Sequence, residues 1–250
     1  MNSSPEHPQT TKLRTFIPQL RDIRRVKTKV YEGKLGSIGT TPSSRYRLVA
    51  VSAVLSLLAV LGASALGPLF SAIIGAGLVA LIAGGWPAAT GVAELRGVYR
   101  ITSHSIIILL TGLASVAITF FQRTDAELSY LPAIAAVGIV ASFMAELSRG
   151  EGAIGRLEST ISSSTGVLAS VSVAGWVGLA HIYQVAGNSF ALVGVGLLVA
   201  LILGAFGARI ISAGPQEGPR RGAVTLGVTP VAFVGVVGYV TATFLTFMVG

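Results

Sequence analysis

The chain contains no cysteine, only three histidines and few charged residues. The lack of cysteine excludes disulfide frameworks, thiolate metal sites, iron–sulfur ligation and cysteine nucleophiles. Charged residues make up 11% of the 250 residues, whereas a soluble domain usually carries about 25%. Hydrophobic residues make up 52%. This balance excludes an ordinary soluble enzyme domain and indicates a polytopic membrane protein.

Seven apolar stretches follow residue 47, and most of them reach the roughly 18–20 residues that an α-helix needs to cross a bilayer. They lack the alternating pattern of a β-barrel strand. We therefore predict an all-α integral membrane protein, with about seven transmembrane helices in one bundle over residues 48–250. The spans are expected at 48–66, 69–86, 104–121, 130–147, 166–185, 190–211 and 224–249. Only Gly67 and Pro68 separate the first two, which predicts either a tight hairpin or a re-entrant loop.

The basic residues predict the orientation, because Lys and Arg near span ends are retained on the cytoplasmic side. With the N-terminus inside, seventeen of the eighteen Lys and Arg residues fall on that side, and Arg123 is the exception. Seven spans then place the C-terminus outside, which gives an N-in/C-out topology. The bias towards Arg, Ala, Gly and Val favours a bacterial plasma membrane. The net charge of +8 is thus a property of the cytoplasmic face, and no nucleic-acid partner is expected.

Residues 1–47 form a basic cytoplasmic tail with three predicted parts. Residues 1–11 are expected to be disordered, and residues 33–47 to form a flexible linker. In residues 12–31, apolar side chains recur at three-to-four spacing opposite basic ones. This pattern predicts an amphipathic interfacial helix that binds anionic lipid of the inner leaflet. The alternative is a docking element for a cytoplasmic partner.

Two spans carry small residues at every fourth position, and such stripes let helix backbones approach closely in lipid. We expect the two stripes to pack against each other as an antiparallel pair; alternatively, one stripe faces another protein or a sliding interface. Shorter stripes occur in the second and third spans. The two long stripes are Ser162, Gly166, Ser170, Ala174 and Gly178, and Gly196, Ala200, Gly204, Ala208 and Ser212, and the shorter ones are Ala76, Ala80 and Gly84, and Thr111, Ser115 and Thr119.

Catalytic chemistry has little support in the sequence. No His-Glu-x-x-His, P-loop or Gly-x-Ser-x-Gly motif is present. His7, His104 and His181 fall in the tail, at the inner face and near the outer face, so they cannot share a metal. We therefore expect no cofactor and no metal, and the balance is against an enzyme. Trp176 is expected to pack in mid-span, and Trp86 to anchor the inner interface.

One group of ionisable residues lies at the predicted cytoplasmic ends of spans two, three and four. Glu146 and Arg149 are three residues apart and are therefore neighbours on a helix, which predicts an interfacial ion pair. The sharper hypothesis is a cytoplasmic vestibule in which Glu146 accepts a proton or a substrate amine. On the outer side, a second polar group forms either a site or an interface belt. The vestibule candidates are Glu94, Arg96, Arg100, His104, Glu146 and Arg149, and the outer residues are His181, Tyr183 and Asn188.

Three functions follow from this pattern. The first is a non-enzymatic accessory or scaffolding subunit of a bacterial respiratory, envelope or secretion complex, with other membrane proteins as partners. The second is a small permease for an uncharged or amphiphilic substrate. The third is a divergent lipid-headgroup enzyme that uses the vestibule residues. The hydroxyl residues that could line the path of a permease are Ser52, Ser56, Thr111, Ser115, Ser170 and Ser172.

Overall fold

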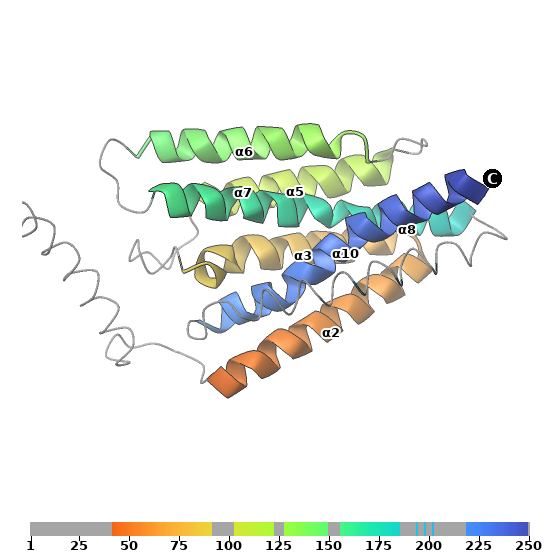
Figure 1. Ribbon diagram of the computed structural model, residues 1–250, viewed down its shortest axis with the longest axis horizontal. Helices are drawn as coiled ribbons and strands as arrows, with labels where there is room; N and C mark the ends of the chain where they lie inside the picture. The colour runs from red at the N-terminus through yellow and green to blue at the C-terminus, as the bar shows by residue number, and fades with distance from the viewer. Residues whose placement is uncertain are drawn as a thin grey trace, which may run out of the picture. The chain divides into compact units, whose positions relative to one another are not determined.

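A computed structural model describes residues 42–91, 103–122, 128–149, 156–185 and 219–249, together with Gly194, Leu198 and Ile202. All of these belong to one compact unit, Thr40–Gly250. The predicted tail elements at 1–11 and 12–31 lie outside the described residues, as does 33–41 of the linker. Residues 42–47, predicted as flexible linker, are instead the helical start of α2. The chain is all-helical over the described part, in agreement with the predicted fold class (Figure 1). Its helices are α2 (Pro42–Leu66), α3 (Pro68–Ala89), α5 (Ser103–Phe121), α6 (Leu131–Leu147), α7 (Arg156–Ser172), α8 (Ala174–Val185) and α10 (Arg220–Val249).

Five segments in the described part are long and apolar enough to cross a membrane. The helix α6 is apolar but shorter, with 17 residues. The predicted sixth span, 190–211, lies outside the described residues except for three helical positions. A count of seven therefore stays a prediction. The five long segments are Arg45–Leu66, Pro68–Ala89, Ser103–Phe121, Arg156–Gln184 and Arg220–Leu245.

The first two helices form a hairpin of two full-length helices. They contain 25 and 22 residues and pack against each other. Gly67 joins them with φ of +124°, a backbone conformation that favours glycine. A Cβ there would also lie 2.8 Å from the Gln184 side chain at the end of α8. A tight hairpin, rather than a re-entrant loop, is what the structure contains.

The predicted fifth span begins earlier than hydropathy indicated. Helix α7 starts at Arg156 instead of residue 166, and α8 continues it after a break at Val173. At this break the amide of Val173 donates to the carbonyl of Ser170, three residues back, so the helix tightens locally. In this earlier part of the helix, hydroxyl side chains such as Thr160 and Thr165 donate to carbonyls four residues back, so they are satisfied within the helix.

From α2 to α7 successive helices run in alternate directions, α8 continues α7, and the described basic residues lie at one end of the bundle (Figure 1). At this end Gly85 of α3 lies against Arg221 of α10. Helix α8 ends at the other end, beside Gly67, whereas α10 begins at the first end. We call the first end the basic end; it holds Arg45, Arg47, Arg149, Arg156, Arg220 and Arg221.

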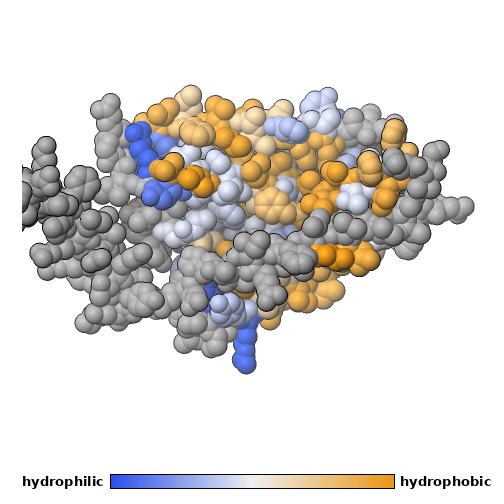
Figure 2. All heavy atoms as spheres, in the orientation of Figure 1, coloured by the Kyte–Doolittle hydropathy of each residue, from blue (hydrophilic) through white to orange (hydrophobic). Residues whose placement is uncertain are grey.

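The outer surface agrees with a membrane environment. Figure 2 shows apolar residues over most of one face of the described helices and strongly hydrophilic ones towards the basic end. Large apolar side chains such as Leu58, Ile73 and Val137 are exposed. A water-exposed surface this apolar is unusual for a monomeric soluble protein. The apolar helices therefore fit a membrane protein.

Both tryptophans dock on the backbone of a neighbouring helix. The Trp86 indole of α3 donates from Nε1 to the Ser162 carbonyl of α7 over 2.6 Å. The Trp176 indole of α8 donates to the Val231 carbonyl of α10 over 2.8 Å. Both side chains are buried. Trp86 thus packs between helices and is not the interface anchor that the sequence suggested, whereas Trp176 packs inside the bundle as expected.

A glycine lies four residues after each of these acceptor carbonyls. These glycines are Gly166 and Gly235, and a Cβ on either would lie within 2.8 Å of the indole that docks there. A helical side chain covers the turn before its own Cα, so a larger residue would cover the acceptor. The Thr225 hydroxyl of α10 repeats the arrangement, because it donates to the Leu81 carbonyl of α3 over 3.0 Å and Gly85 follows four residues later. We call these three arrangements carbonyl–glycine contacts.

Candidate functional site

A buried polar cluster lies at the basic end, where three helices meet. His104 is in the first turn of α5, Glu146 in the last turn of α6, and Ser159 and Ser163 are one turn apart near the start of α7. All four side chains are buried, with Glu146 only 3% and His104 only 5% exposed. Ionisable groups are costly to bury in an apolar bundle unless they are paired. The hydrogen bonds and ion pairs of these four side chains therefore decide whether their burial is tolerated.

The Glu146 carboxylate binds groups from all three helices. Its Oε1 lies 2.5 Å from His104 Nε2 and accepts a hydrogen bond from the Ser159 hydroxyl over 2.7 Å. Its Oε2 accepts from Arg149 Nη1 over 2.6 Å. Both oxygens are thus occupied, and charge-assisted bonds of this kind are the stronger class of hydrogen bond.

The second nitrogen of the His104 ring is also bound. Nδ1 lies 2.6 Å from the Ser163 hydroxyl oxygen. The same hydroxyl donates to the main-chain carbonyl of Ser159 over 2.5 Å. Ser159 and Ser163 present their hydroxyls on one face of α7 because they are four residues apart. Ser159 binds the carboxylate and Ser163 binds the imidazole of the His104–Glu146 pair, which joins α5 to α6.

Two arginines complete the basic side of the cluster. Arg149 follows α6 and pairs with Glu146 at i,i+3 spacing. Arg156, at the start of α7, donates to the main-chain carbonyl of Glu146 from Nη2 over 3.0 Å and from Nε over 3.3 Å. A cation at the C-terminal end of a helix satisfies terminal carbonyls and opposes the helix dipole. Arg156 therefore ties the end of α6 to the start of α7.

The structure brings together His104, Glu146 and Arg149 from the predicted vestibule. Glu94, Arg96 and Arg100 lie outside the described residues. Of the three that are described, His104 and Glu146 are buried and Arg149 is exposed. The vestibule of six residues stays a prediction. Sequence reasoning missed Ser159, Ser163 and Arg156. The available signal was the four-residue spacing of the two serines, on a segment assigned to a loop.

The small-residue stripe of the fifth span is buried along α7 and α8. A Cβ on Gly166 would meet Trp86 of α3 and Ile108 of α5, and one on Gly112 of α5 would meet Ser170. The stripe thus contacts α3 and α5 at these positions, and its expected contact with the stripe of the sixth span stays a prediction. That second stripe (Gly196, Ala200, Gly204, Ala208 and Ser212) lies outside the described residues.

The shorter stripes differ from each other. Thr111, Ser115 and Thr119 of α5 are buried, whereas Ala80 and Gly84 of α3 are exposed. The serines and threonines proposed as a permease path each donate to a carbonyl of their own helix. These bonds use the hydroxyl hydrogens within each helix, and the path itself stays a prediction. The six residues are Ser52, Ser56, Thr111, Ser115, Ser170 and Ser172.

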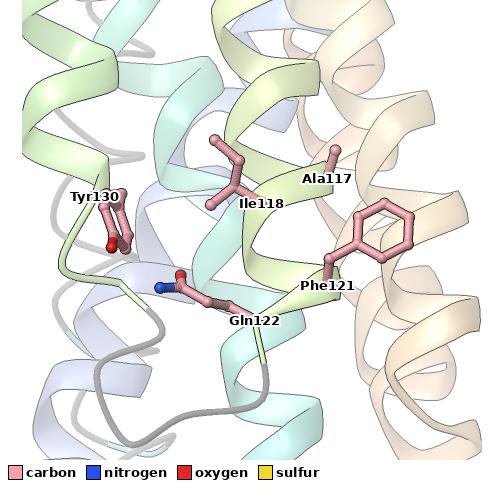
Figure 3. A pocket seen from close by; sticks show the side chains of 5 residues that line it. All are labelled: Ala117, Ile118, Phe121, Gln122 and Tyr130. Atoms are coloured by element: carbon pink, nitrogen blue, oxygen red, sulfur yellow. The ribbon is translucent and has the colours of Figure 1, made fainter.

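The opposite end of the bundle holds a hollow of about 430 Å³ between the end of α5 and the start of α6. Figure 3 shows its lining side chains, with Gln122 and Tyr130 extending into the space between the two helices. Of the outer polar group, His181 is half-buried, Tyr183 is exposed and Asn188 lies outside the described residues. The hollow is lined by Ala117, Ile118, Phe121, Gln122 and Tyr130.

Over the described ranges, no three His, Cys, Asp or Glu side chains lie close enough to hold a metal ion together. What the cluster at the basic end can do chemically is hold a proton between an imidazole and a carboxylate, and fasten three helices. A comparison of the chain with protein-family models, curated proteins and solved structures finds no match.

Proposed function

We propose that this chain is a non-enzymatic, multi-pass protein of a bacterial plasma membrane that works as an accessory or scaffolding subunit of a membrane complex. The observation that carries the proposal is that the polar groups of the buried cluster bind one another. Both carboxylate oxygens of Glu146 and both ring nitrogens of His104 bind groups of the same chain. A substrate site needs polar groups left for the substrate, whereas these contacts fasten α5, α6 and α7 to one another.

The exposed face of α3 supports association with other helices. Ala80 is exposed, and no heavy atom of the described residues lies within 4 Å of the position that a Cβ would take on Gly77 or Gly84. Small residues let the backbone of another helix come close, and close van der Waals packing is what drives helix association in lipid. This face therefore suits the close packing of a transmembrane helix from a partner protein.

The distribution of arginine supports a cytoplasmic location for the basic end. All six described Lys and Arg residues lie there. The positive-inside rule counts such residues near span ends. The N-terminus is then cytoplasmic, and α10 ends on the outer side.

Copurification tests the subunit proposal. The tagged chain is extracted from its native host with a mild detergent, and proteins that elute with it at constant ratio after size exclusion are identified by mass spectrometry. We expect a fixed set of membrane proteins, and Gly84→Leu should reduce their yield. The matched control is Gly62→Leu, since Gly62 of α2 is also exposed and has open space around its Cβ position. Elution of the chain alone, or only with copies of itself, contradicts the proposal.

A permease for an uncharged or amphiphilic substrate is the second candidate, and the buried His104–Glu146 pair favours it. Ionisable residues inside membrane helices often mark ion or proton pathways. A permease would transport as the sole protein in liposomes, with a pH dependence that Glu146→Gln changes. A scaffolding subunit would show no flux there, and Glu146→Gln would leave its partners unchanged.

A further inference from the structure

The hydrogen positions in the buried cluster follow from its donors and acceptors. A main-chain carbonyl has no hydrogen to give, and a serine hydroxyl has only one. The Ser163 hydroxyl lies 2.5 Å from the Ser159 carbonyl, so the hydroxyl hydrogen is used in that bond. The contact between Ser163 Oγ and His104 Nδ1, at 2.6 Å, then needs a hydrogen from the ring. With the hydroxyl hydrogen in that bond, Nδ1 of His104 carries a proton.

The contact on the other side of the ring needs a second hydrogen. His104 Nε2 and Glu146 Oε1 lie 2.5 Å apart, and without a hydrogen between them two lone pairs would face each other. Ser159 cannot provide it, because its hydroxyl hydrogen lies in the bond to Glu146 Oε1. The hydrogen lies on the imidazole, as an imidazolium beside a carboxylate, or on the carboxyl, as a carboxylic acid beside a neutral ring. Both arrangements hold the same number of protons.

We propose that His104 and Glu146 form a proton-binding site, which holds one proton more than a neutral imidazole beside a carboxylate. The site is distinct from the proposed scaffolding role and does not depend on it. Among the described residues, the charged and titratable groups at this site include His104 from α5, Glu146 and Arg149 from α6 and the turn after it, and Arg156 from α7. Helix α3, which packs on α5 and α7, contributes no titratable side chain over its described length.

The same residues can also accommodate the state without the extra proton. When Nδ1 gives its proton to water at the basic end, the Ser163 hydroxyl turns from the Ser159 carbonyl to the ring and donates to Nδ1. Nε2 keeps its hydrogen and its bond to the Glu146 carboxylate. One proton leaves, one hydroxyl rotates, and each ring nitrogen still has a hydrogen-bond partner. Ser163 is the positioning residue, because its hydroxyl accepts a hydrogen bond from Nδ1 in the first state and donates one to Nδ1 in the second.

The ring nitrogens of His104 test the proposal directly. The chain has three histidines, so the full chain with His7→Ala and His181→Gln, labelled with ¹⁵N-histidine and placed in nanodiscs, reports His104 alone. The pH is raised from 5 to 10, and an infrared spectrum records whether a carboxylic acid is present. We expect Nδ1 to be protonated at the start, together with a protonated Nε2 or a carboxylic acid band. At higher pH one proton should leave, and Nδ1 should become the unprotonated nitrogen. A ring whose protonation stays unchanged over this range overturns the proposal.

Two carboxylate variants separate this site from a general effect of charge. Glu146→Gln removes the partner, so the second proton should be lost from the pair and the ring should carry one hydrogen at pH 7. Glu158→Gln is the matched control, because Glu158 is exposed on α7; its titration should equal that of the parent. An unchanged titration in Glu146→Gln, or an equal change in both variants, overturns the proposal. The measurement on the parent protein stands even if Glu146→Gln fails to fold.

Discussion

A methyl group added at Gly166 should destabilise the bundle by a predictable amount. In Gly166→Ala, the new Cβ would lie 2.5 Å from Ile108 Cδ1 and 2.8 Å from both Cδ1 and Nε1 of Trp86. Ordinary carbon contacts are about 3.5–4.0 Å, so the indole must move. Overpacking of this kind costs about 1–3 kcal/mol. Movement of the indole also breaks its bond to the Ser162 carbonyl, and polar bonds between membrane helices are worth about 0.6–1.7 kcal/mol.

The matched control is Gly84→Ala, which makes the same chemical change on α3. Over the described part of the chain, no heavy atom lies within 4 Å of that Cβ position. The gain from replacing glycine in a helix, about 0.5–1 kcal/mol, applies to both variants and cancels in their comparison. Gly166→Ala should therefore be less stable than Gly84→Ala by about 2–4 kcal/mol, from the overpacking and the lost bond together.

Reversible unfolding in mixed micelles measures this difference. The mole fraction of sodium dodecyl sulfate is raised, and helicity and tryptophan fluorescence are followed in both variants and the parent. Coincident transitions by the two probes justify a two-state free energy. Equal free energies of unfolding for the two variants would refute the reasoning, because the glycine would then have no role in seating the indole.

Further predictions concern other contacts and the topology. Gly85→Ala should also destabilise the bundle by about 1–3 kcal/mol in the same unfolding experiment, since its Cβ would overlap the Thr225 side chain; a stability equal to that of the parent would contradict the contact. Glu146→Ala should cost about 1–3 kcal/mol, because the buried His104 ring and the Ser159 hydroxyl lose the acceptor they share; a loss below 1 kcal/mol would show that solvent reaches the site. The chain has no cysteine, so an impermeant thiol reagent should label Ser148→Cys only from the cytoplasm and Tyr130→Cys only from outside; the reverse pattern would contradict the orientation.

The sequence predicted the helices well where composition alone determines them. The apolar runs after residue 47 became α2 and α3, and their boundary at Gly67 is a glycine with positive φ. The start of α7 was misplaced by ten residues because a hydropathy scale counts Ser159 and Ser163 as polar. In the folded chain their hydroxyls bind carbonyl, carboxylate and imidazole groups, so they pay little for burial.

The candidate site was predictable only within one helix. The spacing of Glu146 and Arg149 places them on one face of α6, and they are paired. The contact of Glu146 with His104 joins residues that are 42 positions apart, and no local periodicity carries that information. The serines escaped notice because their partners come from other helices. A single sequence reports which residues share a helix face, but not which faces meet.

The carbonyl–glycine contacts have a consequence for the order of assembly. Each acceptor, such as the Val231 carbonyl, lies within a continuous helix and accepts with a lone pair that the helix itself does not need. Docking of Trp176 therefore requires no helical hydrogen bond to open. The helices can insert one at a time, each with its backbone already satisfied, and join afterwards without any backbone group facing lipid unpaired. Because the acceptor is a main-chain atom, no side-chain replacement at Val231 deletes it, so the position can vary in sequence while the tryptophan and Gly235 cannot.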